Sequence, residues 1–150
     1  MDQNVISQWV EAHREEFLED IKALVRIQSD RGEPKPGAPF GEGPNNALTK
    51  ALEIAGGYGF KTTNYDGYVG TVDFLPDNDH HLDILSHMDC VPVADGWTVT
   101  GPFDPIVKDG KIYGRGTSDD KGPGVAALYA LRCLKELNVP LKHNVRLIWG

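Results

Sequence analysis

Apolar side chains recur every three or four residues over several long segments, which predicts amphipathic helices. In residues 3–28 the apolar positions on one face are Ile6, Trp9, Val10, Phe17, Ile21, Leu24 and Val25. Residues 46–60 predict a second helix, which a pair of glycines would stop. Residues 122–138 predict another helix with leucines along one face. The proline- and glycine-rich residues 29–45 predict a long loop between the first two helices.

Shorter apolar or alternating segments predict strands. These segments are residues 60–75, 81–89, 103–115 and 143–150. Two of them contain a hairpin signal, Asp66-Gly67 in the first and Asp109-Gly110 in the third. The other two have apolar centres that indicate buried strands. Helices and strands therefore alternate, which predicts an α/β sandwich with a mostly parallel or mixed sheet.

Charge and composition restrict the partners. The chain has 150 residues, with 15 Lys and Arg against 22 Asp and Glu, so the formal net charge is 15 − 22 = −7. An acidic chain is poorly suited to a phosphate backbone, so we expect no nucleic acid partner. The apolar runs are shorter than the ~20 residues of a membrane helix, and the N-terminus lacks the pattern of a secretory signal, so we expect no membrane partner. The two cysteines form no CxxC pair, which favours a reducing cytoplasm.

The first candidate for chemistry is the His-x-Asp pair at the end of the predicted strand 81–89. His87 and Asp89 lie two residues apart and point to the same side of an extended chain. Ligands of open α/β sheets bind beyond the carboxyl ends of strands. A carboxylate beside an imidazole can accept the second ring N–H of a metal-bound histidine. The plain alternative is a strand-end turn, because this pair of residues also occurs often by chance.

The second candidate is "YGRGTSDDKGPG", residues 113–124, which places Asp119 and Asp120 side by side among glycines. A phosphate-binding loop is excluded, because Lys121 follows aspartate rather than glycine and two carboxylates would repel phosphate. The carboxylates could instead mark the N-terminus of the next helix, where the dipole favours them. In the third interpretation a divalent cation neutralises Asp119. Lys121 or Arg115 could then neutralise Asp120.

Together the two stretches resemble a known family. "SHMDCVP" followed by "GWTVTGPFDPIVKDGKIYGRGTSDDKGPG" is similar to the di-zinc exopeptidases, which include carboxypeptidase G, desuccinylases, aminoacylases and bacterial dipeptidases. The Asp-Asp-Lys-Gly-Pro form and the "GEGPNNAL" segment most resemble the PepV-type (Xaa-His) dipeptidases. The resemblance implies a three-layer α/β sandwich with a mixed sheet. Residues 1–150 would be the N-terminal part of its catalytic domain, and the lid domain would lie outside this chain.

The resemblance also implies roles for individual residues. His87 matches a histidine that binds one zinc ion, and Asp119 matches the carboxylate that bridges two zinc ions. Asp89 matches the aspartate that orients the histidine, and it is our one candidate in the catalytic machinery. The peptide bond between Asp119 and Asp120 is expected to be cis. Zinc suits nitrogen and oxygen ligands, and without thiolates manganese or cobalt is also possible.

The implied reaction is the hydrolysis of dipeptides, with a small peptide as substrate. In the family a catalytic glutamate and a further acidic ligand follow the strand that matches residues 143–150, so we expect the 150-residue chain alone to be inactive. Two alternatives remain. The complete protein could remove acyl or succinyl groups from amino acids with the same metal pair. The chain could also be a non-catalytic, truncated copy that acts by binding, and its oligomeric state stays open.

The remaining histidines and cysteines are expected to be structural. The four histidines outside the motif are expected at the surface: His13, His80, His81 and His143. Cys90 lies beside Asp89 but is expected to pack rather than bind metal. Cys133 falls on the apolar face of a predicted helix and is expected in the core.

Overall fold

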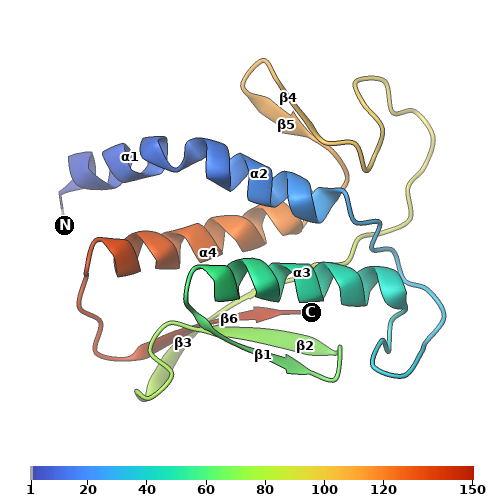
Figure 1. The fold of residues 1–150 in the computed structure, drawn as a ribbon. Helices are drawn as coiled ribbons and strands as arrows, with labels where there is room; N and C mark the ends of the chain where they lie inside the picture. The colour runs from blue at the N-terminus through green and yellow to red at the C-terminus, as the bar shows by residue number, and fades with distance from the viewer. Residues whose placement is uncertain (1) are drawn as a thin grey trace.

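The computed structural model describes residues 2–150, with the helices gathered on one side of a sheet (Figure 1). The helices are α1 (Gln3–Ala12), α2 (Arg14–Val25), α3 (Glu42–Gly57) and α4 (Lys121–Glu136). The strands are β1 (Lys61–Tyr65), β2 (Val69–Asp73), β3 (His80–Ser86), β4 (Ile106–Lys108), β5 (Lys111–Tyr113) and β6 (Asn144–Trp149). The main sheet has the order β1-β2-β6-β3, and β4 and β5 form a separate hairpin. β3 is parallel to β6, and the other neighbours in the main sheet are antiparallel.

The layers follow from which helix covers which strands. α3 packs on β1 and β2, α4 packs on β3 and β6, and α2 packs on α4 (Figure 1). The predicted α/β class and mixed sheet are confirmed. Of the three layers expected, residues 2–150 form the sheet and one helical layer. No helix in this part of the chain is both long enough and apolar enough to cross a bilayer.

Both predicted hairpin turns are present. Asp66 and Gly67 have φ values of 53° and 75°, and Asp109 and Gly110 have values of 52° and 72°. Two successive positive φ angles are typical of the type I′ turn, whose twist matches that of the flanking strands. Aspartate and glycine tolerate this backbone region better than most residues. The turns therefore form where the local sequence predicts them.

The expected helix over residues 3–28 is interrupted at His13. This residue has φ −104° and ψ 7°, outside the helical region, and it separates α1 from α2. Its ring Nδ1 donates to the carbonyl oxygen of Trp9 at 2.7 Å, and the two rings stack with centroids 4.0 Å apart. Only 22% of the His13 side chain is exposed, so the expectation of a surface histidine was wrong. Helical periodicity continues through the break, which hides it in the sequence.

α3 begins earlier than the sequence indicated. The helix starts at Glu42 and includes Pro44, whereas residues 42–45 were assigned to the preceding loop. Proline is tolerated in the first turn of a helix, because the N–H it lacks would have no partner there. The proline therefore marks the start of α3 rather than the end of a loop.

β3 differs from the expectation of a buried strand. It is one of the two edge strands of the main sheet formed by residues 2–150, and 53% of Leu82 and 72% of Leu85 remain exposed. Among residues 2–150, no helix covers the face of the sheet on which Leu85 lies. Apolar composition predicted the strand correctly, but it could not predict that this strand lies at the edge.

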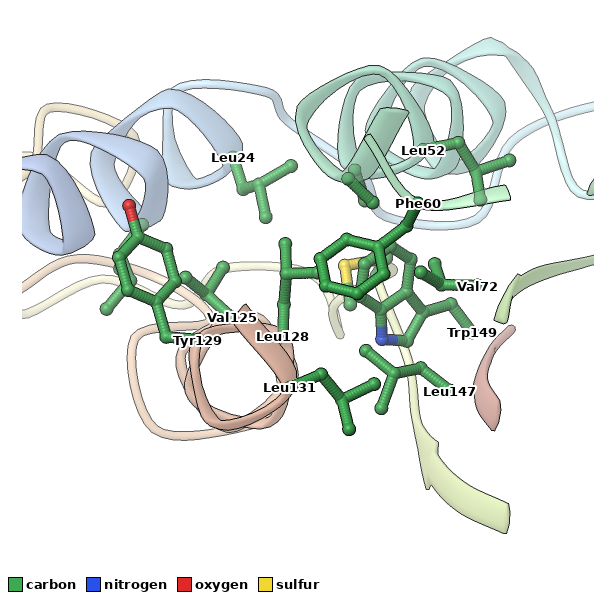
Figure 2. Close-up of a cluster of buried hydrophobic side chains, with 14 of the residues drawn as sticks. Leu24, Leu52, Phe60, Val72, Val125, Leu128, Tyr129, Leu131, Leu147 and Trp149 are labelled. Carbon is green, nitrogen blue, oxygen red and sulfur yellow. The ribbon is translucent and has the colours of Figure 1, made fainter. Parts of the chain in front are cut away.

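The core lies between the helices and the covered face of the sheet. Figure 2 shows large apolar side chains from α2, α3 and α4 meeting those of β2 and β6. Leu128 of α4 is 1% exposed, and it lies in one cluster with Leu147 and Trp149 of β6, which are 0% and 1% exposed. This packing holds the N-terminus of α4 close to the carboxyl end of β3.

Leu128→Ala should lower the free energy of unfolding by about 3 kcal/mol, because it removes a buried side chain and leaves a cavity. Urea denaturation of the purified chain measures this loss. Leu85→Ala is the matched control, since the same atoms are removed from a side chain that is largely exposed. The control should change stability by less than about 0.5 kcal/mol. Equal losses in both variants would contradict the core described above.

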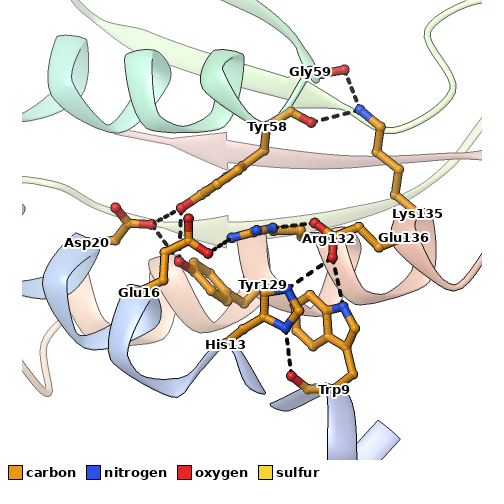
Figure 3. Close-up of polar contacts among 10 residues, drawn as sticks. All are labelled: Trp9, His13, Glu16, Asp20, Tyr58, Gly59, Tyr129, Arg132, Lys135 and Glu136. Carbon is orange, nitrogen blue, oxygen red and sulfur yellow. Dashed lines mark hydrogen bonds and ion pairs between the residues drawn. The ribbon is translucent and has the colours of Figure 1, made fainter. Parts of the chain in front are cut away.

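A polar network joins α1 and α2 to the C-terminal half of α4 (Figure 3). The guanidinium of Arg132 donates to Glu16 and to Glu136, each at 2.7 Å. It also lies 3.8 Å from the centroid of the Tyr58 ring. The indole N–H of Trp9 donates to Glu136 at 2.8 Å. These contacts fix α1 and α2 against α4 on both sides of the break at His13.

Two tyrosine hydroxyls complete this network on Asp20. Tyr58 and Tyr129 donate to the same carboxylate oxygen, Oδ2 of Asp20, at 2.6 and 2.7 Å. Burial raises the pKa of both tyrosines, and their hydrogen bonds to Asp20 raise it further. Both hydroxyls therefore keep their protons and act as donors.

Tyr129→Phe should lower the free energy of unfolding by about 1–2 kcal/mol, because Asp20 loses one of its two hydroxyl donors in a partly buried position. Thermal and urea denaturation both report this change. Tyr68→Phe serves as the control, because its ring is 56% exposed. A loss in the Tyr129 variant no larger than in the control would show that the network contributes little to stability.

Candidate metal centre

The carboxyl end of β3 presents His87 and Asp89 on one side. Between them Met88 is fully buried, and its backbone N–H donates to the carbonyl oxygen of Gly150 at 2.8 Å. The hydroxyl of Ser29 donates to the carbonyl oxygen of Met88 at 2.9 Å. The extended chain alternates its side chains, so with Met88 inside, both neighbours face outward. The backbone on which the two candidates lie is therefore held from two directions.

Asp119 comes from the loop between β5 and α4. Gly124, in the first turn of α4, lets the helix approach the end of β3, because a Cβ there would lie 2.6 Å from Cε of Met88. Gly122 lies against the carbonyl oxygen of Thr117, with no room for a side chain between them. The peptide bond between Asp119 and Asp120 is cis, as the resemblance implied. These contacts place Asp119 next to His87, although the two residues are 32 positions apart in the chain.

The three predicted site residues meet at short distances. His87 Nδ1 lies 2.8 Å from Asp89 Oδ1, and His87 Nε2 lies 3.1 Å from Asp119 Oδ1. The two ring nitrogens of one histidine thus each face a carboxylate. The side chain of Asp119 is 87% exposed, and those of His87 and Asp89 are about half exposed at 43% and 48%. A solute can therefore reach Nε2 of His87 and the carboxylate of Asp119.

The charges around His87 favour a cation. Partial burial alone would lower the pKa of His87, but the hydrogen bond to Asp119 and the charge of Asp89 outweigh it, and the pKa is raised. The two carboxylates therefore stabilise positive charge between them. A divalent metal ion would meet the same stabilisation as the proton.

The donor atoms present fit a zinc ion. Two ligands of a tetrahedral zinc, each about 2.0–2.1 Å from the metal, lie about 3.3 Å apart, close to the 3.1 Å between Nε2 of His87 and Oδ1 of Asp119. Asp89 accepts from the other ring nitrogen, so a metal ion that displaces the proton between Nε2 and Asp119 would meet the lone pair of Nε2. Among residues 2–150, no group of three or more His, Cys, Asp and Glu side chains is arranged to hold a metal ion. This part of the chain therefore offers two candidate ligand side chains and a carboxylate beside one of them.

The lysine and arginine of the motif do not neutralise Asp120. Neither side chain forms an ion pair with it in the described part of the chain. Lys121 is fully buried and donates to the main-chain oxygens of Leu24 and Ile27, and burial lowers its pKa to about 8. The guanidinium of Arg115 lies 5.5 Å from the centroid of the Trp97 ring. Asp120 occupies the N-cap position of α4, although its side chain makes no capping hydrogen bond, so the helix-terminus interpretation applies to Asp120. The cation interpretation of Asp119 stays a prediction.

The structure also shows a supporting residue that sequence reasoning missed. Ser29 is fully buried, and its hydroxyl donates to the backbone next to His87, 59 positions along the chain. No local pattern distinguishes this serine from others in a loop. Cys90 is buried beside it, which confirms that this cysteine packs, and Cys133 is buried in the core as expected.

Comparison with known proteins identifies the family. The model of "Peptidase family M20/M25/M40" matches residues 84–150, the segment that contains all three candidate residues. Residues 84–150 therefore match a domain of this peptidase family. A relative from Bacillus subtilis (strain 168), "Putative dipeptidase YtjP", is 43% identical over 139 residues, which cover 91% of the chain and 30% of the relative. The chain thus spans about 30% of the length of the curated relatives it matches.

Solved structures of the M20 peptidases share the fold. Human carnosine dipeptidase 1 superposes with a TM-score of 0.79 at 25% identity, over 98% of this chain and 34% of that one. The M20 family metallo-carboxypeptidase Sso-CP2 from Sulfolobus solfataricus gives a TM-score of 0.74 at 26% identity, over 90% of this chain and 30% of that one. The α/β arrangement is therefore that of an M20 catalytic domain, seen over part of its length.

Proposed function

We propose that this chain supplies the first part of the active site of a zinc-dependent dipeptidase. Residues 1–150 would be the N-terminal part of its catalytic domain, with His87 and Asp119 as metal ligands. The observation that carries the proposal is the placement of Nε2 of His87 3.1 Å from Asp119, while Asp89 holds the opposite ring nitrogen. The dipeptidase names among the relatives support the substrate class.

The residues of this chain would act by orientation and charge. Asp89 accepts the N–H of Nδ1, which fixes the tautomer in which Nε2 of His87 carries a lone pair. Asp119 has two accessible oxygens, and it projects from a turn held by the close approach of Gly122 and Thr117. When bound, a pair of zinc ions would acidify a water molecule and polarise the scissile carbonyl group. Manganese or cobalt would suit the same nitrogen and oxygen donors.

The number of metal ligands in this chain bears on whether the chain is active by itself. A catalytic zinc usually has three protein ligands, and this chain offers two side chains for two metals. We therefore propose that the 150-residue chain alone has no appreciable peptidase activity. The buried, unpaired Cys90 and Cys133 are compatible with the cytoplasm, where we place the complete protein.

The proposal is tested on the full-length protein that contains this chain. Purified protein is assayed against a panel of dipeptides beside N-acetyl and N-succinyl amino acids, before and after treatment with a chelator. We expect dipeptide hydrolysis that is lost on chelation and restored by Zn²⁺, and none from the 150-residue chain. Turnover of the acyl amino acids alone would make the protein a deacylase. Metal-independent dipeptide turnover would contradict the proposed metal site.

A further inference from the structure

Lys121 immediately follows Asp119 and Asp120 in residues 116–122, which we call the metal loop, yet its side chain points into the protein. The residue is 0% exposed, and it is among the largest fully buried side chains of the chain. Its Nζ donates to the carbonyl oxygen of Leu24 at 2.9 Å and to that of Ile27 at 2.8 Å. Lysine is almost never fully buried unless its ammonium group is paired.

The two acceptors lie at the C-terminal end of α2. Leu24 is in its last turn, and Ile27 lies two residues beyond its end. The last carbonyl groups of a helix have no partner within the helix, and they carry the negative end of its dipole. A lysine ammonium is a good donor for such a position. Lys121 thereby ties the first residue of α4 to the end of α2, more than 90 positions earlier in the chain.

The metal loop also packs on the aliphatic part of this side chain. Gly116 has φ 90°, and a Cβ at this position would lie 2.9 Å from Cδ of Lys121. The N–H of Gly122 donates to the carbonyl oxygen of Gly116 at 3.2 Å, which closes the loop around Lys121. Asp119 lies inside this closed loop. Residues 116–122 therefore fold around the buried side chain of Lys121, which supports the conformation of the loop.

We propose that Lys121 is a positioning residue, whose bonds to the end of α2 hold the loop that places Asp119 opposite His87. The inference rests on the proposed function for the identity of the metal ligands. It goes further by assigning the placement of one ligand to a side chain that touches neither metal nor substrate. α2 thereby becomes part of the support of the site.

The test compares Lys121→Met with a matched variant on the same helix. Lys135 also donates to two main-chain carbonyl groups at the end of a helix, those of Tyr58 and Gly59 after α3, at 2.9 and 2.5 Å. It lies at the far end of α4 from the metal loop, so Lys135→Met removes the same kind of bond elsewhere. Lys121→Gln has an uncharged and shorter side chain, and it takes the place of the methionine variant if that variant does not fold.

Two readouts are measured on the full-length protein that contains this chain, under conditions in which every variant is fully folded. Amide hydrogen exchange at Gly122 and Gly124 reports on the loop, since both N–H groups donate to main-chain oxygens there. We expect exchange at these amides to be at least tenfold faster in Lys121→Met and unchanged in Lys135→Met. Titration with Co²⁺ reports on the ligands, and we expect the Kd to rise about tenfold in the first variant only.

Some results would contradict the role of Lys121, and another would contradict the proposed metal function. Loop exchange in Lys121→Met that matches wild type, or equal effects in the two variants, would overturn the inference. A wild-type full-length protein that binds no Co²⁺ would count against the proposed metal function. In that case the exchange comparison alone decides whether Lys121 holds the loop.

Discussion

A Gly122→Ala chain is expected to lose more than about 4 kcal/mol of its free energy of unfolding, which places it among the exceptional single substitutions. A Cβ at this position would overlap the carbonyl oxygen of Thr117, a backbone atom that cannot rotate away. Relief requires α4 and the loop before it to move apart. That movement would also displace Asp119 from His87, so the variant should lose both stability and the geometry of the site.

Urea denaturation followed by far-UV circular dichroism measures this effect. Gly57→Ala is the control, because Gly57 is the last residue of α3 and has no atom near the position of a new Cβ. Alanine is the better helix former, so this control should gain up to about 1 kcal/mol. A Gly122→Ala chain as stable as wild type would show that α4 and the metal loop are not packed as described.

Asp119→Asn in the full-length protein should lower kcat/KM for a dipeptide at least about 10³-fold, equivalent to roughly 4 kcal/mol of lost transition-state stabilisation. The change removes a negative charge and one carboxylate oxygen from the residue proposed to bridge two metal ions. Fold and stability should change little, because the side chain of Asp119 is 87% exposed. Steady-state kinetics with added Zn²⁺ measures the loss.

The control for this variant is Asp77→Asn, which makes the same change at an exposed position outside the metal motifs. It should retain wild-type kcat/KM. An Asp119→Asn protein within tenfold of wild type, with unchanged metal content, would remove Asp119 from the proposed site.

Local signals predicted the parts of the fold that depend on local physics. The Asp66-Gly67 and Asp109-Gly110 turns formed as expected, because two positive φ angles are determined within the turn itself. The interruption at His13 was missed, since it depends on a ring that bonds and stacks with Trp9 while the apolar period continues. The exposure of Leu85 was missed because hydrophobicity indicates a strand and not its place in the sheet.

The three residues of the candidate site could be predicted from short stretches of the sequence. Two short motifs contain His87, Asp89 and Asp119, and the order of strand and helix brings them together. The supports of the site were not predictable in this way. Ser29 and Lys121 bond to main-chain oxygens, which any residue carries, across 59 to 97 positions of the chain. The sequence therefore indicates which groups are candidates for the chemistry, but not which groups hold them in place.

The central claim is that His87 and Asp119 bind the same divalent metal. Crystals of the full-length protein soaked in ZnCl₂, with diffraction recorded on both sides of the zinc absorption edge, test it most directly. We predict an anomalous peak within bonding distance of Nε2 of His87 and of the Asp119 carboxylate. A peak only at the exposed, stacked pair of His81 and His143, or no peak between His87 and Asp119, would contradict the account.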